Sequence, residues 1–266
     1  MSLMIGTSGW QYRDWRGAFY PAGVPLSRWL EHYAEHFGVV ENDGTFYRLA
    51  SRDTFASWRE RTPAGFVMAI KASRYLTHIR RLKDPAEPVA RLLGAAGGLG
   101  DRLGPVLLQL PPNLKADPAL LADCLRQFAT EFARQPNSGH GGGRVCVEFR
   151  HESWFTDEVR SILTEHHAAL CWSDRLGRPL GPLWRTADWG YLRLHEGAAE
   201  PWPRYGRQSL QSWIRRIAEA FPPEADVFVF FNNDQNCAAP ADADALAAIA
   251  AKADWPVARP VPAATD

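Results

Sequence analysis

The sequence lacks the residue pairs and runs that mark several common classes of protein. Its four cysteines, Cys124, Cys146, Cys171 and Cys237, are far apart and form no C-x-x-C pair, which excludes a zinc ribbon and a thioredoxin motif. No window of about 18 apolar residues occurs, and no basic segment followed by an apolar one stands at the N-terminus. We therefore expect buried, reduced thiols in a cytoplasmic protein that makes no contact with a membrane.

An excess of either sign of charge is also missing. The 266 residues include 30 Lys+Arg and 30 Asp+Glu, so no net positive field favours non-specific binding to nucleic acid, although a local basic patch stays open. Hydrophobic residues make up 46% of the chain, which is enough to build a full core. Composition indicates a globular protein and names no partner.

Eight short β-rich runs alternate with helical patterns, as in repeated strand–helix units around a parallel sheet. The runs cover residues 3–8, 39–46, 66–72, 105–111, 144–150, 168–174, 189–195 and 226–234. Helical patterns cover residues 27–38, 51–62, 87–96, 118–133, 156–167, 209–221 and 239–253. Between the runs 168–174 and 189–195, the segment "GRPLGPLW" (177–184) is too short and proline-rich for a helix.

Eight strands in about 250 residues predict the α/β class and a TIM-type (β/α)8 barrel in one domain. We expect residues 1–252 to form the barrel and the Pro/Ala-rich residues 253–266 to form a C-terminal tail. The glycine-rich "RQPNSGHGGGR" (134–144) follows a predicted helix and lacks G-K-[ST]. We therefore expect a flexible loop rather than a phosphate-binding loop.

Alternation of side chains along the strands predicts that polar residues gather at one end of this barrel. In the fifth run, Val147 and Phe149 form a face for the helices, whereas Glu148 and Arg150 share the interior face. In the sixth run, Asp174 is assigned to the interior. Active sites of TIM barrels lie at the carboxyl ends of the strands. The predicted mouth holds Glu41, Asp43, Lys71, Gln109, Glu148, Arg150, Asp174, Arg193, His195 and Asn232. For any one of them, a structural ion pair is the alternative interpretation.

The chain also resembles a known family, the YecE-like proteins or "domain of unknown function 72". The resemblance rests on "IGTSGWQYRDWRGAFYP" (5–21), "VENDGTFYRL" (40–49), "FVMAIKASRYLTHIRRL" (66–82), "LGPVLLQLPP" (103–112), "VEFRHESWF" (147–155), "YLRLHEG" (191–197) and "FNND" (231–234). It implies a TIM barrel and establishes no activity. The family usually reads E-I-N-S-T-F-Y, so Asp43 stands where Asn is usual and Gly44 where Ser is usual. We expect the site to be present with an altered charge.

Two kinds of catalytic site are weighed for this mouth. A glycosidase needs two carboxylates about 5–10 Å apart, which Glu41 and Glu148 could supply. By analogy, however, barrel glycosidases carry carboxylates where this chain has Gln109 and Arg193. A metal-dependent hydrolase needs several His, Asp or Glu ligands. The candidates are Glu41, Asp43, Glu148, Asp174, His151 and His195. Neighbouring cations would repel a metal ion, so no metal or other cofactor is assigned, and a divalent metal stays an alternative.

Lys71 supports a third kind of chemistry. A Schiff-base lyase uses a lysine whose pKa is lowered by burial or by neighbouring cations, and Lys71 is the only lysine inside a predicted strand. Arg150 and Arg193 would lower its pKa, whereas pairing with Glu148 or Glu41 would raise it. Both interpretations stay open at this stage.

The pattern favours an enzyme, of hydrolase or lyase type, that acts on an anionic or sugar-like small molecule. The residues assigned to catalysis are Glu148, Lys71, Glu41, His195 and Asp174, with Glu148 as the leading acid or base. The residues assigned to substrate binding are Asp43, Gln109, Arg150, Arg193, Asn232, Trp10, Arg74 and His78.

Two further functions remain alternatives. Arginines and aromatic residues in the loops after the strands also suit a nucleic-acid-binding or DNA-repair barrel of endonuclease type that receives an extruded nucleotide. The other alternative is a non-catalytic module that binds a small molecule. The oligomeric state is not predicted.

Overall fold

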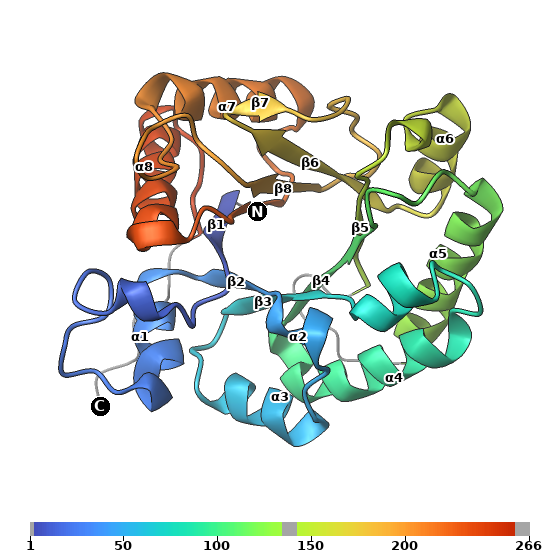
Figure 1. Ribbon diagram of the computed structural model, residues 1–266, viewed down its shortest axis with the longest axis horizontal. Coiled ribbons are helices and arrows are strands. Elements are labelled where there is room, and N and C mark those ends of the chain that lie inside the picture. Colours follow the sequence, from blue (N-terminus) through green and yellow to red (C-terminus); the bar gives the residue numbers. More distant parts are fainter. Residues whose placement is uncertain (1–2, 135–142, 259–266) are drawn as a thin grey trace.

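Eight parallel strands close into a barrel in the computed structural model, which describes residues 3–134 and 143–258 (Figure 1). They are β1 (Leu3–Ser8), β2 (Val39–Asn42), β3 (Val67–Lys71), β4 (Leu103–Gln109), β5 (Val145–Glu148), β6 (Ala169–Arg175), β8 (Gly190–Leu194) and β9 (Val227–Phe231). Each strand pairs with the next, and β9 pairs with β1. The two-residue β7 (Arg178–Pro179) lies antiparallel to β6. The predicted TIM-type barrel is confirmed.

Helices surround the barrel (Figure 1). They are α1 (Trp29–His36), α3 (Arg52–Glu60), α4 (Ala86–Ala96), α5 (Pro118–Ala133), α6 (Asp157–Glu165), α7 (Arg207–Ala220) and α8 (Ala238–Lys252). Side-chain caps begin three of them, because the oxygens of Ser51, Asp117 and Thr156 accept hydrogen bonds from N–H groups of the first turn. The first helix, α1, has no side-chain cap. A turn of 3-10 helix, Leu26–Arg28, precedes α1, so that Arg28 takes the N-cap position.

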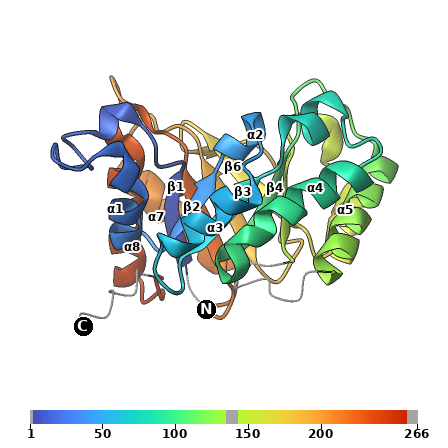
Figure 2. The ribbon, with the colours of Figure 1, turned by 90° about the horizontal axis from the view of Figure 1, so that it is seen from below.

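Several strands end earlier than predicted, and the changes at β2 and β5 move Asp43 and Arg150 off the strands. The second strand stops at Asn42, and the short helix α2 (Gly44–Tyr47) follows. Thr45 Oγ1 bonds to Asn42 O (3.1 Å) and Lys71 O (2.7 Å), which turns the chain over the end of β3. The fifth strand stops at Glu148, so Arg150 lies beyond it. Figure 2 shows α2 at the upper end of the barrel, and this is the end where the strands finish.

Two apolar layers hold the barrel together. The interior layer consists of Met4, Val39, Val67, Ala69, Leu107, Cys146, Ala169, Cys171, Ala187, Trp189, Tyr191, Phe228 and Phe230. The outer layer packs the strands on the helices and includes Val145, Val147 and Phe149, as predicted for β5. Because apolar side chains fill the barrel, its interior is a solid floor below the polar mouth.

The face predicted for β6 is wrong. Trp172 lies in the outer layer and its indole N–H donates to Trp184 O (3.0 Å), while Ala169 and Cys171 lie in the interior. Asp174 has the parity of Trp172 and therefore leaves the interior face. "AALCWSD" is apolar on both faces, so alternation could not orient this strand.

The remaining sequence predictions concern thiols and chain ends. All four cysteines are free; Cys237 is half-buried and the others are buried. No helix in the described part of the chain is long and apolar enough to cross a membrane. Most of the predicted loop 134–144 lies outside the described residues, as do residues 259–266. Of the predicted tail, residues up to 258 attach to β1, because Leu3 N donates to Pro256 O (2.8 Å) and Ala258 N donates to Leu3 O (3.0 Å).

Candidate functional site

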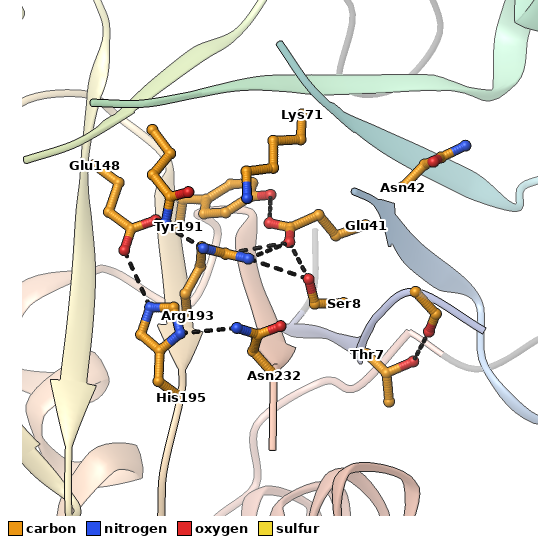
Figure 3. A network of polar contacts seen from close by, with 12 residues as sticks. Thr7, Ser8, Glu41, Asn42, Lys71, Glu148, Tyr191, Arg193, His195 and Asn232 are labelled. Carbon is orange, nitrogen blue, oxygen red and sulfur yellow. Dashed lines mark hydrogen bonds and ion pairs between the residues drawn. The ribbon is translucent and has the colours of Figure 1, made fainter. Parts of the chain in front are cut away.

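Arg193 is the centre of the polar mouth (Figure 3). It ends the inward face of β8 and is only 1% exposed. Its Nη1 donates to Glu148 Oε2 (2.8 Å), and its Nη2 and Nε donate to Glu41 Oε1 (2.8 and 3.1 Å). Nη2 also donates to Ser8 Oγ (3.1 Å). A single guanidinium therefore bridges two carboxylates that are both fully buried.

Glu148 accepts hydrogen bonds at both oxygens. Besides Arg193, Gln109 Nε2 donates to Oε2 (3.1 Å), and His195 Nε2 (3.0 Å) and Arg150 Nη2 (2.6 Å) converge on Oε1. Burial by itself raises the pKa of Glu148, but the neighbouring cations and the bond from His195 outweigh it and hold the pKa well below its usual value. The lowered pKa makes Glu148 an anion at neutral pH that orients other groups, and it favours this role over the predicted one as the leading acid or base.

His195 is held between two partners. Its Nδ1 lies 2.9 Å from the amide nitrogen of Asn232, and its Nε2 faces Glu148 (Figure 3). With the amide nitrogen as donor, Nδ1 accepts and Nε2 carries the proton that is given to Glu148. Burial, together with the charges of Arg193 and Arg150, lowers the pKa of His195 against the opposing effect of Glu148. The structure thus brings His195 to Glu148 and Asn232 to His195, with each of the two residues directly after the end of its strand.

Two side chains of this network were not among the predicted site residues. Tyr191 Oη donates to Glu41 Oε2 (2.5 Å), and the Ser8 hydroxyl donates to Glu41 Oε1. Tyr191 shares the inward parity of Arg193, so strand alternation could have found it. Ser8 was missed because nothing in the sequence of the run 3–8 distinguishes this serine from the other serines of the chain.

Lys71 lies at the end of β3 with 8% of its surface exposed. Within the described residues its Nζ makes no hydrogen bond and no ion pair; it lies 4.4 Å from the centroid of the Phe46 ring. Burial and the charge of Arg193 lower the pKa of Lys71, against the opposing effect of nearby carboxylates. The expected alternative of a direct pair with Glu41 or Glu148 is therefore wrong.

Asp43 follows β2 and lines a cavity of about 240 Å³ beside the mouth. Burial and the charge of Glu41 raise the pKa of Asp43 to about 6. Trp10 lines the same cavity, but it is 4% exposed and packs edge-on against Trp58 at 5.6 Å. The indole of Trp10 therefore serves mainly as a wall.

Asp174 is buried outside this network. Its Oδ1 accepts the backbone N–H of His195 (2.7 Å), and both oxygens accept the hydroxyl of Tyr205 (2.8 Å each). Burial raises the pKa of Asp174 to about 7, although these hydrogen bonds oppose the shift. Asp174 thus positions the backbone of His195, and the structure does not bring its carboxylate to the other predicted catalytic groups.

This raised pKa makes a testable prediction. A carboxyl group whose pKa is higher in the folded than in the unfolded state stabilises the fold most at low pH, and the contribution is lost as pH rises through about 7. We expect Asp174→Asn to remove this dependence, so that wild-type protein loses about 1–3 kcal/mol relative to the variant between pH 4 and pH 8. Urea unfolding across this range measures it. The exposed Asp188→Asn is the control, and equal slopes for wild type and Asp174→Asn would contradict the prediction.

Positive side chains gather on one side of the mouth. Burial lowers the pKa of His78, and so do the charges of Lys71, Arg74, Arg150 and Arg81, in that order. His78 lies in a turn of π-helix (Tyr75–Ile79) after β3, and its ring packs against Phe46 at 5.0 Å. The charges of four cations from three chain segments thus act on one half-buried imidazole.

The residues considered as metal ligands do not gather. In the described ranges, the one group of three His, Cys, Asp or Glu side chains with ligand atoms close enough for a metal is His32, Glu35 and His36 on α1. His151 lies after β5 and its Nδ1 accepts the N–H of Ser153 (3.2 Å). The mouth carboxylates are instead bridged by a guanidinium, so these residues do not fit a resident metal ion.

Comparison with known proteins identifies the relatives of this chain. The model of the family "Protein of unknown function DUF72" matches residues 4–265. The UPF0759 protein YunF of Bacillus subtilis is 25% identical over 262 residues, covering 87% of this chain and 89% of YunF.

Two solved structures share the fold. The crystal structure of a DUF72 family protein from Thermotoga maritima superposes with a TM-score of 0.75 at 25% identity, covering 94% of this chain and 99% of that one. A DUF72 family protein from Enterococcus faecalis gives a TM-score of 0.75 at 17% identity, over 99% of this chain and 100% of that one. From the family match over nearly its whole length, the chain belongs to the DUF72 family of YecE-like proteins.

Proposed function

We propose that this protein is an enzyme whose substrate is a small anionic molecule bound at the carboxyl ends of β2, β3 and β5. The observation that carries the proposal is that Lys71 at the end of β3, Arg74 and Arg81 on either side of the turn Tyr75–Ile79, and Arg150 after β5 all act on His78 in that turn. Like charges repel, and among the described residues only Arg150 of these four is paired with a carboxylate, that of Glu148, so an anion bound beside the other three would stabilise the fold. A phosphate or carboxylate would supply that anion.

Arg193 has a different role in this proposal from the one expected of it. All three of its nitrogens donate to Glu41, Glu148 or Ser8, so it bridges the buried carboxylates, and with 1% exposure it is largely closed to a ligand. The anion is instead bound by Arg74, which is exposed, and by Arg150, which keeps 31% of its side chain accessible while it contacts Glu148.

Anion binding is predicted to raise the pKa of His78. A bound phosphate favours the imidazolium, so its titration midpoint should rise by about half a unit to one unit when inorganic phosphate or citrate is added at low salt. Histidine NMR signals measure this, with the signal of His78 assigned by a His78→Gln variant. Arg74→Ser should weaken binding about 5–10-fold, whereas Arg126→Ser on the outer helix α5 should not. If both anions leave the His78 midpoint unchanged, the mouth is not an anion site.

A second candidate function rests on a different observation. Three large apolar side chains near this cluster are exposed: Tyr47 (81%), Tyr75 (46%) and Ile79 (57%). Aromatic rings beside arginines can stack on the bases of single-stranded nucleic acid. Fluorescence anisotropy with a single-stranded oligonucleotide tests this function: affinity should fall steeply as salt is raised, and Tyr47→Ala with Tyr75→Ala should reduce it. Absence of binding at low salt would exclude this function and leave the proposal above intact.

A further inference from the structure

Lys71 has the features of a reactive amine. The chain has four lysines, and Lys83, Lys115 and Lys252 are exposed, so Lys71 is its one buried lysine. Figure 3 shows its side chain reaching from β3 toward Arg193 and Glu41 with no interaction drawn from the amine. A buried ammonium with no hydrogen-bond acceptor is costly, because it gives up water and gains no partner. The neutral amine avoids that cost and is the nucleophilic form.

Charged groups of both signs lie around the amine, and none of them contacts it directly. The titratable groups that act on it are Arg193 from β8, Glu41 from β2, Glu148 from β5 and Asp43 after β2, and His78 lies close enough to feel its charge. Burial and Arg193 lower its pKa, and the three carboxylates moderate this effect. Phe46 covers it with an aromatic face. This environment favours the neutral, nucleophilic amine more than water does.

We propose that Lys71 forms an imine with the carbonyl carbon of an anionic aldehyde or ketone, whose phosphate or carboxylate is bound by Arg74, Arg81 and Arg150. The inference rests on the proposed function, because the same cations hold the anionic group. Nζ bonds to the carbonyl carbon to give a carbinolamine. The carbon–oxygen bond then breaks, and the oxygen leaves as water with the two protons that the amine loses. Nothing is oxidised or reduced, and no co-reactant is needed.

Asp43 is suited to carry the protons in this step. It faces the cavity beside the mouth and its charge acts on Lys71, to which α2 is tied through the bond from Thr45 Oγ1 to Lys71 O. With a pKa of about 6, it exists in both protonation states near neutral pH and can give a proton to the departing oxygen. An Asn at this position, as the family resemblance leads one to expect, could not do so.

Reductive trapping tests the imine directly. Wild-type protein is mixed with sodium cyanoborohydride and one of three carbonyl probes: pyruvate, an oxo acid; glyceraldehyde 3-phosphate, a sugar phosphate; or propanal, which is neutral. Peptide mass mapping then gives the rate of labelling at each lysine. We expect at least one anionic probe to label Lys71 at least about tenfold faster than it labels the three exposed lysines. The comparison of pyruvate with glyceraldehyde 3-phosphate identifies the class of anion.

The controls separate the two proposals. Lys71→Arg keeps the positive charge and should keep the anion-induced shift of the His78 pKa while losing the label; Lys115→Met should change neither. One outcome is that phosphate or citrate shifts the His78 pKa while the carbonyl probes label Lys71 no faster than Lys83, Lys115 and Lys252. In that case the imine proposal is wrong and the anion site stands. If no anion shifts the His78 pKa, the proposed function is wrong, and the imine inference that rests on it loses its anion site.

Asp43→Asn tests the proton carrier by its pH profile. Trapping of the wild type should slow as pH rises above about 6, where Asp43 loses its proton. The variant should be slower by up to about 100-fold at low pH and should lack this decline. If the variant keeps the pH profile of the wild type, Asp43 does not carry the proton. Labelling of Lys71 would still test whether the imine forms.

Discussion

Arg193→Met is expected to lower the free energy of unfolding by about 3–5 kcal/mol, measured by urea unfolding at neutral pH. The variant leaves Glu41 and Glu148 as two fully buried carboxylates without their shared cation. The long apolar side chain of methionine fills much of the space, so the loss is mainly electrostatic. At lower pH the carboxylates become protonated, and the difference from wild type should shrink.

Two variants make this interpretation specific. Arg150→Met removes the partly exposed cation on Glu148 and should cost about 1 kcal/mol or less. Combining Arg193→Met with Glu41→Gln and Glu148→Gln removes the charges together and should recover part of the stability, because neutral amides cost less to bury than unpaired carboxylates. A triple variant less stable than Arg193→Met would show that packing dominates over charge at the centre of the mouth.

Phe228→Ala is expected to destabilise the protein by a similar amount, about 3–5 kcal/mol. Phe228 is fully buried in the barrel interior, with ring centroids of Tyr191, Phe230 and Trp189 6.0–6.4 Å away. Because closed strands cannot collapse onto the missing ring, the substitution leaves a cavity and loses contacts on several sides. Thermal and urea unfolding give the change in stability.

A ligand separates this cavity from general disruption. Benzene should stabilise Phe228→Ala and leave the wild type unchanged, since an apolar cavity of ring size stays dry and binds an apolar guest. Phe155→Ala, at a half-buried ring on the outer surface, should cost about 1 kcal/mol and gain nothing from benzene. A small loss for Phe228→Ala would mean that the interior is loosely packed and does not form a rigid floor for the mouth.

Strand alternation predicted most of the mouth but failed at three strands for identifiable reasons. It placed Glu41, Lys71, Gln109, Glu148, Arg193, His195 and Asn232 on inward faces, because each of these strands has a clearly apolar face opposite. It failed at Asp174, where both faces of β6 are apolar. It also continued β2 through Asp43 and β5 through Arg150, since nothing local marks where a strand gives way to a tertiary turn.

The sequence by itself determined the barrel, the end of it where polar groups collect and the family to which the chain belongs. The period of its apolar residues and the motifs after its strands carry that information. The tertiary structure decided which of those polar groups pair. Glu148 is saturated by donors from β4, β8 and the loop after β5, Arg193 is taken up by two glutamates, and Lys71 is left without a partner. Such pairing depends on distances of a few ångströms between side chains of different strands, which no pattern along a single strand contains.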